Sequence, residues 1–237
     1  MAFVASVAVP HRVSSPLRSA FLPAISTRPA RTSSPFAAPA MSASHPLFAA
    51  FCKDVADSAA KRANAREAHL QYIRSDEFAT FFAGPLKQSP TSPFEASLII
   101  IKSPDYNTAK RKFELDPYAE ARVFESTHIR QWRCGMTNTP LPAQLFMVWC
   151  VDKPRSLQLR ADTRAAHLQW WKLSHRKGII GPFPCQGGAN GTLIVCSGDS
   201  VDEVRQWAAT DPYYKAQLFD SVTVLECKNV VDNVSHS

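Results

Sequence analysis

The chain contains an internal repeat, and a repeat constrains the fold strongly because each copy must form the same unit. Residues 47–72 align with residues 145–170 without a gap, and 12 of the 26 aligned positions are identical. Shorter matches continue the repeat: Gly84-Pro85 with Gly181-Pro182, and Asp116-Pro117-Tyr118 with Asp211-Pro212-Tyr213. The sequence therefore predicts two copies of one module, at residues 45–136 and 145–231, joined by a Pro-containing linker at residues 137–144.

Both modules are expected to contain the same elements in the same order. Apolar and β-branched runs predict strands at residues 47–52, 78–84, 96–102 and 121–132 in the first module, and at residues 145–151, 179–181, 192–196 and 218–227 in the second. One helix follows the first strand of each module. In the second module, Gly178 is expected to cap the C-terminal end of this helix. The other helix follows the third strand, and its predicted N-caps are Ser103 and Ser200.

This β-α-β-β-α-β order is the split βαβ, or ferredoxin-like, arrangement, in which both helices lie on one face of an antiparallel sheet. One such sheet leaves its other face exposed, and a second copy can cover that face. The predicted fold class is therefore α+β, with two tandem ferredoxin-like modules packed sheet to sheet as an intrachain pseudo-dimeric α+β barrel. No apolar run reaches the roughly 20 residues of a membrane-spanning helix, so no membrane insertion is expected.

The N-terminal segment differs in composition from both modules. Residues 1–41 contain four Arg, no Asp or Glu, and many Ser, Ala and Pro residues, a composition typical of an organelle transit peptide. Six prolines oppose the long amphipathic helix of a mitochondrial presequence. We expect residues 1–44 to be a disordered plastid transit peptide, the chloroplast stroma to be the location, and residues 232–237 to be a short tail. The alternative is a disordered basic tail with a binding role.

The formal net charge of +7 comes mainly from that segment. Without residues 1–41, 23 Lys and Arg residues face 20 Asp and Glu residues, so the charge no longer predicts nucleic-acid binding. The six cysteines form no C-x-x-C pair, and the sequence contains no phosphate-binding loop, dinucleotide motif or nucleophile elbow. Neither a metal nor a cofactor is therefore expected.

Each first helix carries two arginines and a histidine at positions i, i+4 and i+7, which places them on one helix face. They are Arg62, Arg66 and His69 in the first module, and Arg160, Arg164 and His167 in the second. Two neighbouring cations lower the pKa of an imidazole and keep it neutral at physiological pH, as a general base requires. His69 and His167 are thus the candidate bases.

Two aspartates are the candidate partners of these histidines. Asp116 and Asp211 each precede a proline at the expected C-terminal end of the second helix, where a carboxylate gains from a cationic or hydrogen-bonding neighbour. In the catalytic interpretation, the aspartate orients the histidine, the histidine moves a proton, and Arg66 or Arg164 stabilises an enolate or phenolate oxygen. In the structural interpretation, the same contacts only hold two helices together.

The repeated motifs resemble those of the YciI-like (YCII-related) proteins of the dimeric α+β barrel superfamily. The resemblance covers both modules and rests on Arg-x-x-x-Arg-x-x-His-Leu (residues 62–70 and 160–168), on Gly-Pro after the second strand, and on Asp-Pro-Tyr. Bacterial members are usually single-module homodimers, so this chain looks like a fused dimer. The resemblance implies a small apolar pocket in each module, a His and Asp acid/base pair, and small ring compounds as substrates of the assigned relatives.

Two classes of function remain open on this basis. The leading hypothesis is a small-molecule enzyme of lyase or isomerase type, and the alternative is a non-catalytic ligand-binding or assembly module associated with a larger plastid complex. The expected catalytic residues are His69, Asp116, His167 and Asp211, and the expected substrate-binding residues are Arg62, Arg66, Arg160, Arg164, Tyr118 and Tyr213. The loops that differ between the copies, residues 87–95 and 187–191, are expected to shape the two pocket mouths differently.

Overall fold

Strands from both modules form one antiparallel sheet. The computed structural model describes residues 45–234, so the predictions for residues 1–44 and 235–237 lie outside the described residues. The strands of the first module are β1 (Leu47–Asp54), β2 (Thr80–Lys87), β3 (Ala96–Lys102) and β4 (Phe124–Trp132), followed by the short β5 (Met136–Asn138). Those of the second are β6 (Gln144–Asp152), β7 (Gly178–Cys185), β8 (Gly188–Cys196) and β9 (Phe219–Lys228), followed by the short β10 (Val231–Asp232).

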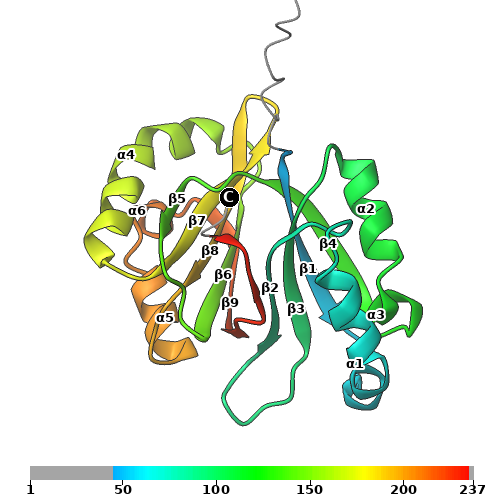
Figure 1. Cartoon of the computed structure of the whole chain (residues 1–237). Helices are drawn as coiled ribbons and strands as arrows, with labels where there is room; N and C mark the ends of the chain where they lie inside the picture. The colour runs from blue at the N-terminus through cyan, green and yellow to red at the C-terminus, as the bar shows by residue number, and fades with distance from the viewer. Residues whose placement is uncertain (1–44, 235–237) are drawn as a thin grey trace, which may run out of the picture. The chain divides into compact units, whose positions relative to one another are not determined.

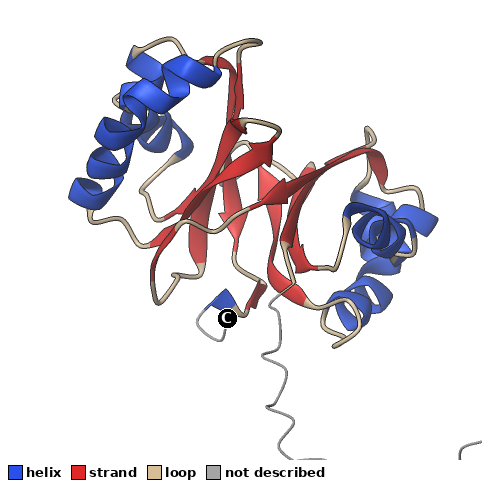
Figure 2. Ribbon diagram, turned by 90° about the horizontal axis from the view of Figure 1, so that it is seen from above, coloured by secondary structure: helices blue, strands red, loops and turns tan. Residues whose placement is uncertain are grey.

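The helices lie on the outer sides of this sheet, with the strands between them (Figures 1 and 2). The first module has α1 (Ala59–Ile73), α2 (Tyr106–Glu114) and α3 (Pro117–Glu120), and the second has α4 (Leu157–Ser174), α5 (Val201–Ala208) and α6 (Pro212–Lys215). The α+β fold class and the element order are therefore confirmed, with α3 and α6 as additional short helices. Within residues 45–234, no helix combines the length and the apolar character that crossing a membrane requires.

The chain that follows the last strand of each module crosses to the other module and closes the barrel. The strand order is β4-β1-β3-β2 in the first module and β9-β6-β8-β7 in the second, and β2 pairs with β9. Beyond β4, strand β5 pairs with β7 and places Met136 opposite Ile180, so the first two residues of the expected linker lie in a strand. Beyond β9, strand β10 pairs with β2 and places Val231 opposite Ala83. The modules are thus joined at both edges, as an intrachain pseudo-dimer requires.

Two glycines permit these crossings. A Cβ atom at Gly181 would collide with the carbonyl oxygen of Arg133 and lie 3.0 Å from Nε1 of Trp132. A Cβ atom at Gly84 would likewise collide with the carbonyl oxygen of Lys228. Nε1 of Trp132 also donates a hydrogen bond of 3.0 Å to the carbonyl oxygen of Gly181. The repeated Gly-Pro is therefore explained by close backbone contact between the modules.

Strand β3 is apolar on both faces because it separates two cores. Leu98 and Ile100 belong to the cluster inside the barrel, which combines residues of both modules and includes Trp132. Ile99 and Ile101 point the other way, into the cluster under the helices of the first module. Side chains alternate along a strand, so a continuous apolar run is required when both faces are covered. The barrel interior is thus a packed core.

Two predicted helix boundaries differ from the observed ones, and one is confirmed. Helix α2 is capped by Asp105 rather than Ser103, because the Asp105 carboxylate accepts a 2.8 Å hydrogen bond from a backbone N–H three residues later. Helix α4 ends at Ser174 and is capped by His175, which adopts the left-handed conformation with φ of 53°, whereas Gly178 begins β7. Ser200 caps α5 as predicted, and its hydroxyl oxygen accepts a 3.1 Å hydrogen bond from the backbone N–H of Glu203.

Replacing Gly181 by Ala tests the crossing of the modules. Because the new Cβ atom would meet backbone atoms of Arg133 rather than a flexible side chain, Gly181→Ala should lower the free energy of unfolding by about 1–3 kcal/mol in urea titrations. Gly135→Ala is the matched control, since the nearest contact of a Cβ there would be the carbonyl oxygen of Ile180 at 3.4 Å. Equal stability of Gly181→Ala and the parent chain would contradict this explanation of the glycine.

Candidate functional site

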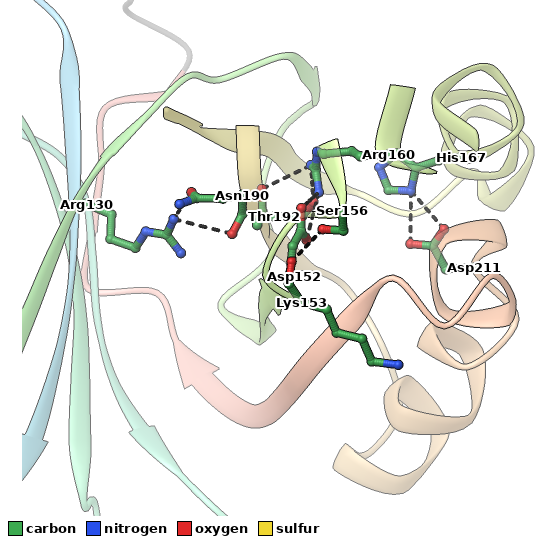
Figure 3. A network of polar contacts seen from close by, with 10 residues as sticks. Arg130, Asp152, Lys153, Ser156, Arg160, His167, Asn190, Thr192 and Asp211 are labelled. Atoms are coloured by element: carbon green, nitrogen blue, oxygen red, sulfur yellow. Dashed lines mark hydrogen bonds and ion pairs between the residues drawn. The ribbon is translucent and has the colours of Figure 1, made fainter. Parts of the chain in front are cut away.

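Each module holds a histidine against an aspartate. In the first module, Nδ1 of His69 on α1 lies 2.7 Å from Oδ1 of Asp116. In the second, Nδ1 of His167 on α4 lies 2.9 Å from both carboxylate oxygens of Asp211 (Figure 3). All four side chains are buried. The structure therefore brings together the candidate base and its candidate partner in both copies.

The aspartates are positioned by the start of a helix rather than by the end of one, which corrects the sequence-based expectation. Asp116 follows α2 but caps the next short helix, α3, and its Oδ1 accepts a 2.8 Å hydrogen bond from the backbone N–H of Tyr118. Asp211 caps α6 and accepts the equivalent bond from Tyr213 at 2.9 Å. The proline after each aspartate suits the first position of a helix, where its missing N–H costs no hydrogen bond. Each carboxylate is thus oriented by its own backbone.

A tyrosine lies between the histidine and an arginine in each module. The rings of His69 and Tyr118 are stacked, with centroids 3.8 Å apart and planes 7° apart. The guanidinium carbon of Arg62 lies 5.1 Å from the centroid of the same tyrosine ring. In the second module His167 stacks on Tyr213 at 4.1 Å. Burial raises the pKa of both tyrosines, so both phenols stay protonated at neutral pH.

The arginines that lie over the two tyrosines are bound to carboxylates that were not among the predicted site residues. Arg62 binds the carboxylate of Asp54 through Nε and Nη2, and its Nη2 also donates to the hydroxyl of Ser97 at 3.0 Å. Arg160 donates from Nη1 to both oxygens of Asp152, at 3.0 and 2.8 Å (Figure 3). Both guanidinium groups are therefore occupied. The sequence did mark both aspartates, because Asp54 and Asp152 are among the identical positions of the repeat.

Two cavities lie beside the histidines, and each is built from both modules. Site 1 is a cavity of about 380 Å³ lined by His69 and Tyr118 of the first module and by residues 228–230 of the second. Site 2 is a cavity of about 620 Å³ lined by His167 and Tyr213 of the second module and by residues 133–136 of the first. Because Nδ1 of each histidine contacts its aspartate, Nε2 is the ring nitrogen left for a ligand.

The other expected binding arginines, Arg66 and Arg164, form no ion pair or side-chain hydrogen bond with residues 45–234. Arg66 lines site 1 and Arg164 lines site 2, and both are exposed. The loops that differ between the copies also reach the cavities: Phe94 lines site 1, whereas Gly187 and Gly188 line site 2. A flat aromatic ring thus stands in the wall of site 1, whereas the corresponding loop at site 2 contributes two glycines and Ala189.

The remaining candidate groups lie away from the two sites. A third cavity, of about 780 Å³, has neither histidine in its lining, and two charged residues that line it, Lys53 and Glu125, pair with each other at 2.7 Å. Cys52 and Cys150 are buried free thiols, as expected from their strands, and burial raises the pKa of Cys52 to about 12. Within residues 45–234, no cluster of three or more His, Cys, Asp or Glu side chains could hold a metal ion.

The buried ion pair behind the second site should be important for stability. Asp152→Ala leaves the buried guanidinium of Arg160 without its carboxylate, so we expect a loss of about 3–5 kcal/mol in the free energy of unfolding, measured by urea titration. Asp202→Ala removes the carboxylate of an exposed ion pair with Arg205 and should change the stability little. Similar losses in the two variants would contradict this assignment.

Comparison with known proteins places these features in a family context. The YCII-related domain matches residues 47–133 and 144–228. Protein YciI of Escherichia coli O6:H1 is 30% identical over 96 residues, which are 36% of this chain and 98% of that protein. A stretch of about one module therefore matches nearly the whole of that bacterial protein.

Solved structures give two further similarities. The 5-chloro-2-hydroxyhydroquinone dehydrochlorinase of Burkholderia phenoliruptrix is 32% identical and covers 34% of this chain and 89% of its own, with a TM-score of 0.32. A chlorite dismutase variant from Candidatus Nitrospira defluvii is 6% identical, with a TM-score of 0.55 over 79% of this chain and 92% of its own. The second similarity spans both modules and concerns the fold alone.

Proposed function

We propose that this chain, which belongs to the YCII-related domain family through both of its modules, transfers protons on a small ring-containing molecule by means of a histidine and aspartate pair in each cavity. The observation that carries the proposal is the repeated contact between a cavity-lining histidine and a buried aspartate, at 2.7 Å in site 1 and 2.9 Å in site 2. Such a pair fixes which ring nitrogen is free to accept a proton.

The proposed chemistry begins with the carboxylate. Asp116 accepts the Nδ1–H of His69, so Nε2 carries the lone pair that removes a proton from a carbon next to a carbonyl group of the ligand. The imidazolium that forms is stabilised by the adjacent carboxylate, and the electron pair moves onto the carbonyl oxygen, where Arg66 opposes the negative charge. Return of the proton to a different atom gives an isomerase, and departure of a leaving group gives a lyase.

The other residues of the stack have a supporting role in this proposal. Arg62 and Arg160 are occupied by buried carboxylates, so they hold Tyr118 and Tyr213 against the histidine rings rather than bind the ligand. A stacked ring restricts rotation of the imidazole about its side-chain bonds, which keeps Nε2 in one orientation. Of the four arginines expected to bind substrate, Arg66 and Arg164 remain available to a ligand.

Exchange of carbon-bound hydrogen for deuterium tests the proton transfer directly. In D2O, cyclohexanone and its ring-substituted carboxylates should exchange their α-hydrogens faster with the protein than without it, as followed by NMR. The double variant His69→Gln/His167→Gln keeps side-chain polarity but removes both bases, and it should lose roughly 100-fold or more of the catalysed rate. Asp116→Asn/Asp211→Asn should shift the pH dependence of exchange, because the amide no longer stabilises the imidazolium.

Lys110→Gln serves as the control for this measurement, since Lys110 is exposed on α2, forms an ion pair with Glu114 and lines neither cavity. The proposal fails if exchange is equally fast in the double histidine variant. It also fails if no ring ketone exchanges faster with the protein than without it.

A second candidate function, an assembly module of a larger plastid complex, is supported by an aromatic patch on the second module. Trp170 and Trp207 stack at 4.3 Å, and Leu173 beside them is 63% exposed. The equivalent positions in the first module include Tyr72, whose hydroxyl donates to the backbone of Lys112. Only the second module therefore presents this surface within the described residues.

Fractionation of the tagged full-length chain tests both this candidate and the proposed plastid address of residues 1–44. We expect the protein in chloroplasts, and assembly would move it to a mass far above that of one chain. Trp170→Ala/Leu173→Ala should then return it to a smaller mass, whereas His167→Gln should not. Recovery from mitochondria would contradict the plastid address, and a species of one-chain mass would contradict the assembly function.

A further inference from the structure

The two cavities carry the same pattern of positive charge. When the two copies of the repeat are aligned, three positively charged residues of one site correspond to three of the other. They pair as Arg66 with Arg164, Arg74 with Lys172, and Lys228 with Arg133. Two of the three pairs exchange Arg for Lys, so the charge is kept where the residue type is not.

These six cations are not neutralised by the protein. Among the residues that the structure describes, none of the six side chains forms an ion pair or a hydrogen bond, and all six are exposed. The described lining of the two sites contains no Asp or Glu side chain. Arg62 and Arg160 differ in this respect, because Asp54 and Asp152 neutralise them. Each cavity thus has three unpaired positive charges at its wall.

The shapes of the cavities, in contrast, have diverged. Site 1 has a volume of about 380 Å³ and is lined by Phe94 and Asn229, whereas site 2 has about 620 Å³ and has Gly187 and Cys134 in its lining. Cys134 is the repeat equivalent of Asn229. The positive charge is thus kept while the volume and the lining of the cavities change. It is therefore the best indicator of what the ligands of the two sites have in common.

We infer that both sites bind small organic anions, with a ring or chain against the apolar wall and a carboxylate or similar acidic group against the three cations. This inference rests on the proposed function and names the substrate class of the same sites. The apolar wall comes from Leu70 and Pro85 in site 1 and from Leu168 and Pro182 in site 2. Volumes of this size suit a molecule of one or two rings.

The position of the third cation links anion binding to the barrel. Lys228 reaches site 1 from the second module, and Arg133 reaches site 2 from the first. Both residues lie at the backbone crossings over Gly84 and Gly181. An anion in either site is therefore bound by charges from both modules, which the fusion in one chain keeps in register.

Isothermal titration of the full chain with benzoate and with benzamide tests the inference. The two molecules have nearly the same shape, and only the acid is charged at neutral pH. We expect benzoate to bind at least about tenfold more tightly than benzamide, and high salt to reduce the difference. Arg66→Gln/Arg164→Gln should weaken benzoate about tenfold or more and leave benzamide unchanged.

Folding of this variant is not at risk, since both arginines are exposed and unpaired in the described structure. Lys110→Gln, which removes an exposed cation outside both cavities, is the matched control and should bind benzoate like the parent chain. Equal affinity for the acid and the amide would overturn the inference. So would unchanged benzoate binding in the double arginine variant, or the absence of benzoate binding at millimolar concentration.

The outcomes also separate this inference from the proposed proton transfer. His69→Gln/His167→Gln should keep its preference for benzoate over benzamide, because the unpaired cations remain. Charge-selective binding without catalysed deuterium exchange would retain the anion sites and reject the chemistry. Catalysed exchange without charge-selective binding would retain the proton transfer and reject the anion sites.

Discussion

The backbone crossing at Gly84 and Gly181 is the contact on which the rest of the structure depends. At each crossing the chain at the end of the last strand of one module passes so close to the second strand of the other that a side chain would not fit. The crossings close the barrel, bury Trp132 inside it, and bring Lys228 and Arg133 to the cavities of the opposite modules. A cavity with walls from two modules cannot form in one module alone, so both sites form only when the barrel closes.

Within each module, a continuous set of polar contacts runs from a strand to a short helix. In the first module it passes from Asp54 through Arg62, Tyr118 and His69 to Asp116. A buried charge is costly unless it is paired and hydrogen-bonded, so removing one member leaves its neighbours unsatisfied. The same contacts recur in the second module. This explains why a duplicated chain with many other differences keeps these residues in both copies, and it provides the rigid support that a proton-transferring imidazole needs.

Sequence reasoning predicted the fold and the histidine and aspartate contacts, because both follow from local patterns that occur twice. It did not predict that Arg62 binds Asp54, since the contact joins a strand to the following helix through orientations that spacing does not define. It placed Asp116 at a helix end, whereas a proline in the next position begins a new short helix there. Gly84 and Gly181 were visible as a repeated Gly-Pro, but their neighbours at the crossing are about 50 or more residues away in the sequence.

The sequence by itself determined that the chain contains two equivalent modules, the order of their elements, and which residues are kept in both, because these depend on periodicity and on identity at fixed offsets. Only the tertiary structure decided which of the kept arginines are neutralised by carboxylates and which remain free at a cavity. Charge pairing depends on distances of a few ångströms between side chains from different elements, and those distances exist only in the folded structure. The unpaired cations, and with them the anionic ligand class that we infer, therefore emerge from the folded barrel rather than from the motifs.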